Sequence, residues 1–153
     1  LTRRGQPVRV YEAGRIGAGS SGGHVGALAP HAPENWNPKK QVQLEALIAA
    51  PGWWAGVAEA GGKDPGYARG GRIQPVAAGT EDRLRERIAH ARANWPDWAG
   101  MALTDRPEAG LVPASPTGLW LIDRLTARIS PRAAGGARAS PPRQRAAAPA
   151  PAI

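Results

Sequence analysis

The sequence predicts an α/β fold in a single domain, on three observations. A short apolar stretch from Val8 to Tyr11 has the composition of a strand and is followed by an acid. Residues 38–60 and 81–95 carry capping residues and spaced apolar positions, which are typical of helices. Strand-like stretches at 72–76 and 119–129 alternate with these helices. A chain of 153 residues is long enough for one domain with a core and too short for two.

The first element is the end of a helix, because Leu1 to Arg4 precede a Gly5 stop and the strand from Val8 to Tyr11. The chain thus begins within an element, and with Leu rather than Met, so we expect residues upstream of Leu1. Residues 17–31 read GAGSSGGHVGALAPH and contain five glycines and two serines. We expect a loop there, directly after the strand.

The first long helix has clear end signals. Asn37 is a suitable N-cap and Pro38 suits the first helical position, where its missing N–H costs nothing. Pro51 lies within the helical pattern, so we expect a kink or break there and a helix pair over 38–60. The glycines at 61–62 end the pattern. We expect the tryptophans at 53–54 to pack into the core.

The elements that follow are read from proline and capping residues. Pro75 favours an edge position for the 72–76 strand. Thr80 can cap the second helix with its side chain, and Pro96 ends that helix. Residues 119–129 alternate well enough for one or two strands. The Ser130-Pro131 pair has the form of a helix start, but we expect that no helix follows it.

The last nineteen residues differ in composition from the rest of the chain. In 135–153, Ala, Pro, Arg and Gly make up 16 of 19 residues, and Ile153 is the one large aliphatic side chain. Such a segment cannot recover its ordering entropy, so we predict a disordered tail at 135–153 after a partial domain at 1–134. These residue types have GC-rich codons, so a reading-frame shift or a misplaced gene end after about Ala134 is our hypothesis for the tail.

Composition excludes several classes of site. The chain has no cysteine, and its three histidines lie far apart, so we expect no metal site. The formal net charge is +8, but Arg and Glu alternate in EDRLRERIAHAR as on a solvated helix face, which weakens a nucleic-acid interpretation. There is no apolar run of membrane-spanning length and no apolar signal segment, so we predict a cytoplasmic protein.

The acid and the glycine-rich loop together favour a dinucleotide site. A carboxylate at the end of a strand can accept hydrogen bonds from ribose hydroxyls, and Glu12 is so placed. Glycine and serine let backbone N–H groups approach a pyrophosphate or a flavin ring, since no bulky side chain intervenes. From composition alone, a loop that serves only as a turn is an equal alternative.

The stretch VRVYEAGRIGAGSSGGHVGALAP resembles the second strand and flavin-contacting loop of the D-amino-acid oxidase and glycine oxidase family of FAD-dependent oxidoreductases. GYARGGRIQPVA and DRLTARISPRAA are similar to later segments of that family, so the resemblance covers about residues 1–134. It implies a fragment of a Rossmann-like FAD-binding domain, with the 8–11 strand in a parallel sheet. The family's first strand and its glycine-rich phosphate turn would precede Leu1, and its C-terminal half would follow.

The resemblance also implies site residues. Glu12, with Ala13 beside it, would bind the adenosine ribose, and Ser20 and Ser21 would contact the pyrophosphate. The residues implied along the isoalloxazine are Val25, Gly26 and Ala27.

Three neighbouring residues have two interpretations each. His24 either contacts the flavin or faces solvent. His31 and Trp36 either line the substrate route or are an ordinary loop histidine and a packed indole. We identify no catalytic acid or base among these residues, since in such enzymes the flavin itself accepts the hydride.

The function implied is that of an FAD-dependent amine or D-amino-acid oxidase or dehydrogenase, which transfers hydride from a substrate C–N carbon to flavin. The partner is then a small amine or amino acid, with no nucleic acid. We expect the 153-residue chain alone to bind FAD weakly or not at all and to be inactive. Two alternatives are a small basic protein that binds nucleic acid or an acidic partner through its Arg-rich tail, and an NAD-dependent enzyme. The loop from Ser20 to Ala27 favours flavin over nicotinamide.

Overall fold

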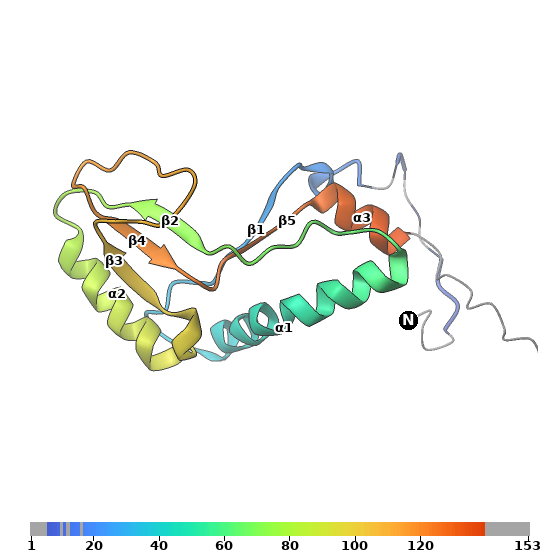
Figure 1. Cartoon of the computed structure of the whole chain (residues 1–153). Helices are drawn as coiled ribbons and strands as arrows, with labels where there is room; N and C mark the ends of the chain where they lie inside the picture. Colours follow the sequence, from blue (N-terminus) through green and yellow to red (C-terminus); the bar gives the residue numbers. More distant parts are fainter. Residues whose placement is uncertain (1–5, 10, 12, 16, 140–153) are drawn as a thin grey trace, which may run out of the picture.

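A computed structural model describes residues 6–9, 11, 13–15 and 17–139 (Figure 1). The helices are α1 (Pro38–Gly61), α2 (Glu81–Asn94) and α3 (Pro131–Ala139), with short 3₁₀ turns η2 (Ser20–Gly22) and η3 (Asp97–Ala99). The strands are β1 (Gly26–Leu28), β2 (Arg72–Pro75), β3 (Met101–Thr104), β4 (Trp120–Asp123) and β5 (Ala127–Ile129). None of the helices in this described part is long and apolar enough to cross a membrane.

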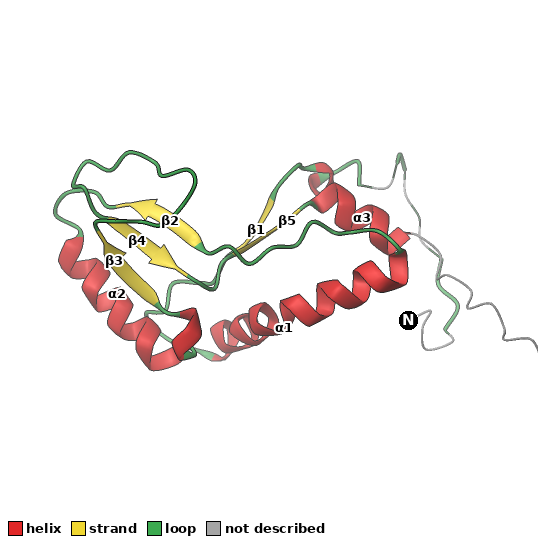
Figure 2. Ribbon diagram, viewed as in Figure 1, coloured by secondary structure: helices red, strands yellow, loops and turns green. Residues whose placement is uncertain are grey.

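The strands form two antiparallel sheets. The larger sheet has the order β2-β4-β3, and the smaller pairs β1 with β5. Figure 2 shows the larger sheet beside α2 at one end of the molecule, and β1 and β5 near α3 at the other. The mixed α/β composition is therefore confirmed. The expected parallel sheet is not found, because both sheets of the described residues are antiparallel.

The core lies between α2 and the three-stranded sheet, and the first turns of α1 contribute to it. Leu84, Ile88 and Ala91 of α2 recur on one helix face and are buried. They share a cluster with Met101 and Leu121 of the sheet. The remaining members of that cluster are Leu44, Leu47, Val76, Trp95, Ala99 and Leu125. This core fixes α2 and the sheet as one unit.

The strand predicted at 8–11 does not form at the residues that the structure describes. Val8, Arg9 and Tyr11 have no strand conformation, and Tyr11 is 86% exposed. Val10 and Glu12 lie outside the described residues. A strand is held by ladder hydrogen bonds to a neighbour, and no described strand pairs with this stretch. Apolar composition alone was therefore not enough to make it a strand.

Helix α1 is one continuous helix, so the expected break at Pro51 and the expected helix pair are wrong, whereas the kink stays a prediction. Its predicted ends are confirmed: the Asn37 side chain accepts a hydrogen bond from the Lys40 backbone N–H at 3.2 Å. At the other end, Gly62 adopts the left-handed conformation with φ +63° and donates its N–H to the Ala58 carbonyl at 2.8 Å. Pro51 lies inside the helix.

The second helix and the strands after it were predicted in part. Pro75 ends β2, which is an edge strand as expected, and residues 119–129 contain two strands. Thr80 stands at the N-cap of α2, but its hydroxyl donates to the Ala77 carbonyl at 2.7 Å and makes no cap hydrogen bond. Strand β1 lies in a stretch that was expected to be a loop, and β3 was not among the predicted strands. Each is short and takes its stability from pairing rather than composition.

Helix α3 corrects the expectation that no helix follows Ser130. It begins at Pro131, and the Ser130 hydroxyl accepts a hydrogen bond from the Ala133 N–H at 3.3 Å. Helix α3 packs against α1 and buries Ala134, which is 6% exposed. Tertiary contact therefore supplies the anchor that the sequence lacks. The helix runs to Ala139, past the predicted boundary at 134, and residues 140–153 of the predicted tail lie outside the described residues.

One junction connects the two sheets. The Asp123 carboxylate at the end of β4 accepts hydrogen bonds from Arg72 Nε at 3.0 Å and from the Thr126 N–H at 2.8 Å. The Thr126 carbonyl in turn accepts the Gly71 N–H at 2.9 Å. These bonds set the turn between β4 and β5, and so direct β5 toward β1.

Candidate functional site

The glycine-rich loop forms a compact turn before β1. Gly17 has a φ of +76°, a conformation that favours glycine. A Cβ on Gly22 would lie 2.5 Å from the Gly17 carbonyl oxygen, so this position also requires glycine. A Cβ on Gly19 would meet nothing within 4 Å. Two of these glycines are thus explained by the loop's own backbone, while the backbone of Gly19 faces open space.

The 3₁₀ turn η2 contains the serines that were expected near a pyrophosphate. Ser21 is exposed, and Ser20 begins the turn, with its side chain outside the described set. Arg132 of α3 donates a hydrogen bond from Nε to the Gly22 carbonyl, which places a guanidinium beside this turn. Ala13 is exposed, and Glu12, the expected ribose ligand, lies outside the described residues. The structure therefore brings a positive charge, which sequence reasoning did not identify, to Gly22 at the end of this turn.

Strand β1 carries the residues that were expected along a flavin ring. Gly26 pairs with Ile129, and a Cβ there would lie 3.1 Å from Ile129 Cγ2 and 3.3 Å from Pro131 Cγ. Gly26 thus allows β1 to pack closely on β5 and the start of α3. Ala27 is exposed and lines a pocket, whereas Val25 is 73% exposed and lies outside that pocket.

An apolar pocket of about 510 Å³ lies between β1 and α1. This volume falls within the range of about 300–1,000 Å³ that is usual for small-molecule and cofactor sites. Of its lining residues, Gln43 alone has a polar side chain besides the indole N–H groups of Trp53 and Trp54. The others are Ala27, Leu28, Ala29, Ala46, Leu47, Ala49 and Ala50. We call this the α1 pocket.

The tryptophans at 53–54 belong to the α1 pocket rather than the core. Trp53 is 59% exposed and Trp54 is half-buried, so the expectation of core packing is wrong for Trp53. Neither was predicted as a site residue. Two adjacent tryptophans shortly after Pro51 are nevertheless a pattern from which an aromatic site can be predicted. An aromatic pair in the lining of an apolar pocket provides flat surfaces for a planar ligand.

The neighbouring histidines and Trp36 are the residues for which two interpretations were open. The His24 and His31 side chains are exposed, and the His31 backbone N–H donates to Gln43 Oε1 at 2.7 Å. Trp36 is half-buried against the core, and its Nε1 donates to Gln41 Oε1 at 3.3 Å. None of these three lines the α1 pocket. Among the described residues, no group of three His, Asp or Glu side chains is arranged to hold a metal ion.

The connection from β1 to α1 is held by charges that the sequence did not reveal. Arg87 Nε of α2 donates to Glu34 Oε1 at 2.6 Å, and Lys40 Nζ donates to the Ala32 carbonyl at 2.9 Å and to the Glu34 carbonyl. Burial raises the pKa of Glu34, but hydrogen bonds from Arg87 and its own backbone, with the charges of Arg87 and His90, lower that pKa below 4.5. The carboxylate is thus charged at neutral pH and fixes the connection to α2.

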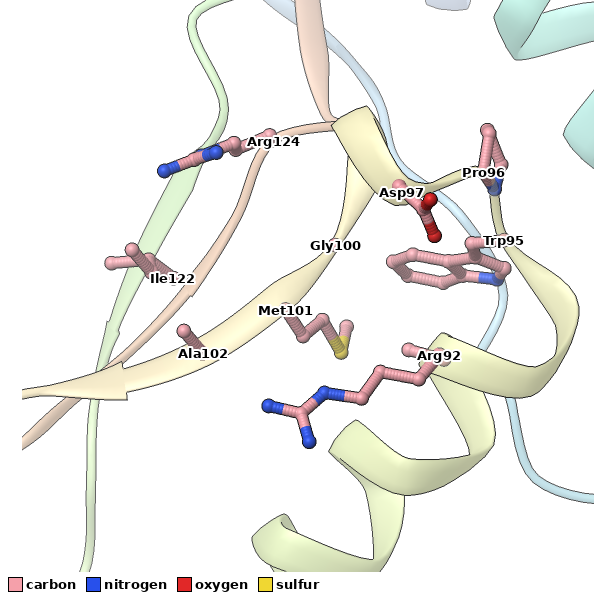
Figure 3. Close-up of a pocket in the computed structure, with 10 residues that line it drawn as sticks. Arg92, Trp95, Pro96, Asp97, Gly100, Met101, Ala102, Ile122 and Arg124 are labelled. Carbon is pink, nitrogen blue, oxygen red and sulfur yellow. The ribbon is translucent and has the colours of Figure 1, made fainter.

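A second pocket, of about 410 Å³, lies where α2 and η3 meet β3 and β4 (Figure 3). Its walls include Trp95, Met101 and Ile122, and its charged lining residues are Arg92, Asp97 and Arg124. In Figure 3, the Arg92 and Arg124 side chains extend toward the same side of the view. None of the residues predicted from the sequence lines this pocket, which has a charged rim, whereas the α1 pocket is apolar.

The spacing Gly-x-Gly-x-x-Gly occurs once in this loop, at Gly17, Gly19 and Gly22. In a dinucleotide-binding domain this spacing lies between a strand and the start of a helix, where the helix N-terminus holds the pyrophosphate. Here the three-residue turn η2 and then strand β1 follow it. The spacing is therefore not a Rossmann fingerprint in this structure.

Comparison with protein families identifies the chain. The model of the family described as FAD dependent oxidoreductase matches residues 1–137, which include the glycine-rich loop, the α1 pocket and most of α3. Comparisons with curated proteins and with solved structures gave no match. The family match confirms the resemblance seen in the glycine-rich loop and covers most of the 153 residues. The chain therefore belongs to the FAD dependent oxidoreductase family.

Proposed function

We propose that this chain forms part of an FAD-dependent enzyme that oxidises a small amine or amino acid at its C–N carbon. The α1 pocket carries the proposal: it is apolar, has the volume of a cofactor site, and Ala27 lies in its wall. Ala27 is one of the residues at which the family resemblance implies the flavin ring. Flavin, when bound, accepts a hydride from substrate, and the protein's part is to bind and orient the two reactants.

The chain's own residues fit such a group in two respects. The alanines at 27, 29, 46, 49 and 50 give the pocket an apolar wall of small side chains. Such a wall suits a planar apolar ring better than a polar wall would. At the other end of the loop, Arg132 Nε donates to the Gly22 carbonyl, and a positive charge there suits a pyrophosphate. We propose that the loop 19–27 follows the cofactor from phosphate to ring. The ribose role of Glu12 and Ala13 stays a prediction.

The experiment is a titration of the ¹⁵N-labelled chain with FAD, followed by NMR, which detects weak binding. We expect low affinity. Backbone amide shifts should concentrate at residues 19–28 and along the pocket face of α1, with little change in β2, β3 and β4. FAD-induced shifts that concentrate outside residues 19–28 and the pocket face of α1 would refute the proposal. Stoichiometric, tightly held flavin in the purified chain would instead overturn the expectation of weak binding.

A matched pair of glycine variants sharpens this test. A Cβ at Gly19 meets nothing within 4 Å, and a Cβ at Gly110, in the loop between β3 and β4, also meets nothing. Neither G19A nor G110A should therefore destabilise the free chain. If the backbone of the loop approaches the cofactor, the methyl group added in G19A hinders that approach. G19A then reduces the size of the FAD-induced amide shifts, and G110A does not. Equal shifts in both variants would place the cofactor elsewhere.

The alternative of a basic protein that acts through an Arg-rich tail stays a prediction, because residues 140–153 lie outside the described residues. The family match favours the flavin interpretation for residues 1–137. An NAD-dependent enzyme is not favoured, since the matched family uses FAD.

A further inference from the structure

Helix α1 contains a proline that ordinarily breaks a helix, and the structure shows what compensates for it. In an α-helix the N–H of residue 51 would bond to the carbonyl of Leu47, but proline has no N–H. Arg69, in the segment between α1 and β2, donates a hydrogen bond from Nη2 to that same Leu47 carbonyl. The same nitrogen also lies 3.5 Å from the Ile48 carbonyl. Arg69 thus supplies the donor that Pro51 lacks.

Arg69 is itself held in place from the other side. Its guanidinium lies 4.8 Å from the centre of the Trp98 ring, in a cation–π contact. Trp98 belongs to η3, beside the three-stranded sheet, so Arg69 connects that unit to the middle of α1. The side chain is partly buried, where a charge-assisted hydrogen bond is stronger than at an exposed site.

The carbonyl that Arg69 contacts lies at the wall of the α1 pocket. Leu47 lines that pocket, and so do Trp53 and Trp54, which follow Pro51 by less than one turn. A change of helix direction at Pro51 would therefore move both indoles relative to β1. We propose that Arg69 is a positioning residue: by completing the hydrogen bonding of α1 at Pro51, it holds Trp53 and Trp54 at the α1 pocket.

The experiment uses the full chain labelled with 5-fluorotryptophan. The chain has six tryptophans, so ¹⁹F NMR gives six resonances, which are assigned with single Trp→Phe variants. The variants are R69M, P51A and R69M/P51A. R69M keeps an apolar stem but loses the donors, and P51A restores a backbone N–H for Leu47. R83M is the control, because Arg83 is an exposed arginine on α2, away from this contact.

The two substitutions should produce distinct patterns. R69M should shift the Trp98, Trp53 and Trp54 resonances, and R83M should shift none of them. In R69M/P51A, Trp53 and Trp54 should return to their P51A positions, while Trp98 stays shifted because its cation–π partner is still missing. The proposal would be overturned if the Trp53 and Trp54 resonances did not shift in R69M. It would also be overturned if they were displaced in R69M/P51A by as much as in R69M.

The outcome stays decisive if R69M does not fold. Folding of R69M/P51A would then support the proposal, because the restored N–H replaces the lost donor. Failure of both variants to fold would contradict it.

The role of the α1 pocket in binding flavin rests on the proposed function and is tested separately. We expect R69M to weaken FAD binding about tenfold, a factor that corresponds to about 1.4 kcal/mol, with recovery in R69M/P51A. If the FAD-induced shifts of the unmodified chain lie outside the glycine-rich loop and the α1 pocket, the proposed function fails, whereas the fluorine resonances still decide the role of Arg69. If FAD binds but R69M leaves its affinity unchanged, the pocket role of Arg69 is wrong.

Discussion

The substitution of Gly71 by alanine tests the junction that joins the two sheets. Gly71 has a φ of +75°, and a Cβ at this position would lie 2.4 Å from the backbone carbonyl oxygen of Asp123. The neighbour is backbone at the end of β4, which is paired on both sides, so it cannot move aside as a flexible side chain can. Either the Gly71 segment or the β4–β5 turn must shift.

The magnitude follows from two terms. An L-residue in the left-handed region costs about 1–2 kcal/mol, and forced overpacking costs about 1–3 kcal/mol more. We therefore expect G71A to lower the free energy of unfolding by about 3 kcal/mol, a large part of the ~5–15 kcal/mol that holds a typical domain. For a chain of this size, that corresponds to a melting temperature lower by roughly 10 °C.

Gly79 provides the matched control. Its φ is +74°, almost equal to that of Gly71, but a Cβ there meets nothing within 4 Å. G79A should therefore show the conformational cost alone, about 1–2 kcal/mol. The assay is urea unfolding of both variants, followed by circular dichroism. Equal losses of stability in G71A and G79A would refute the reasoning, because the close approach to Asp123 would then have no energetic consequence.

Two further predictions concern charge and the end of the chain. Because the pKa of Glu34 is lowered in the folded state, its pair with Arg87 stabilises the fold above pH 4.5, and this contribution is lost as the pH falls through the lowered pKa. E34Q should reduce the acid dependence of the melting temperature, whereas D82N, which changes a fully exposed carboxylate on α2, should leave it unchanged. Equal curves for E34Q and the unmodified chain would contradict this. A chain that ends after Ala139 should melt at the same temperature as the full chain and keep its FAD-induced shifts, as calorimetry and NMR can measure. If that truncation instead removes a salt-sensitive association with an oligonucleotide, the tail is a nucleic-acid contact.

Local signals in the sequence determined the elements whose stability is mainly local. The Asn37 cap, Pro38 at the first turn and the glycine stop at 61–62 set the limits of α1, and all three were predicted from residue type. The same holds for the edge position of Pro75. The family was also predicted from the sequence, since the glycine-rich loop carries its resemblance and the family model covers residues 1–137.

Tertiary contacts decided the remaining elements. Arg69 lies eighteen residues after Pro51 in the sequence, so nothing local indicates that it keeps α1 intact. Strand β1 depends on β5, about one hundred residues later, and α3 depends on α1 for an apolar surface. The 8–11 stretch has strand composition, yet no described strand pairs with it.

The α1 pocket shows the same division between local and long-range causes. Ala27 was predicted as a site residue because its loop resembles a flavin-contacting segment, but the opposite wall comes from Trp53 and Trp54, which local reasoning placed in the core. Residue type thus determined the ends of α1 and the edge position of Pro75, and the resemblance of the glycine-rich loop indicated the family. The sheet partners, the course of α1 through Pro51 and the pocket depend on groups that meet only when distant segments pack together, and such pairings leave no local pattern in the chain.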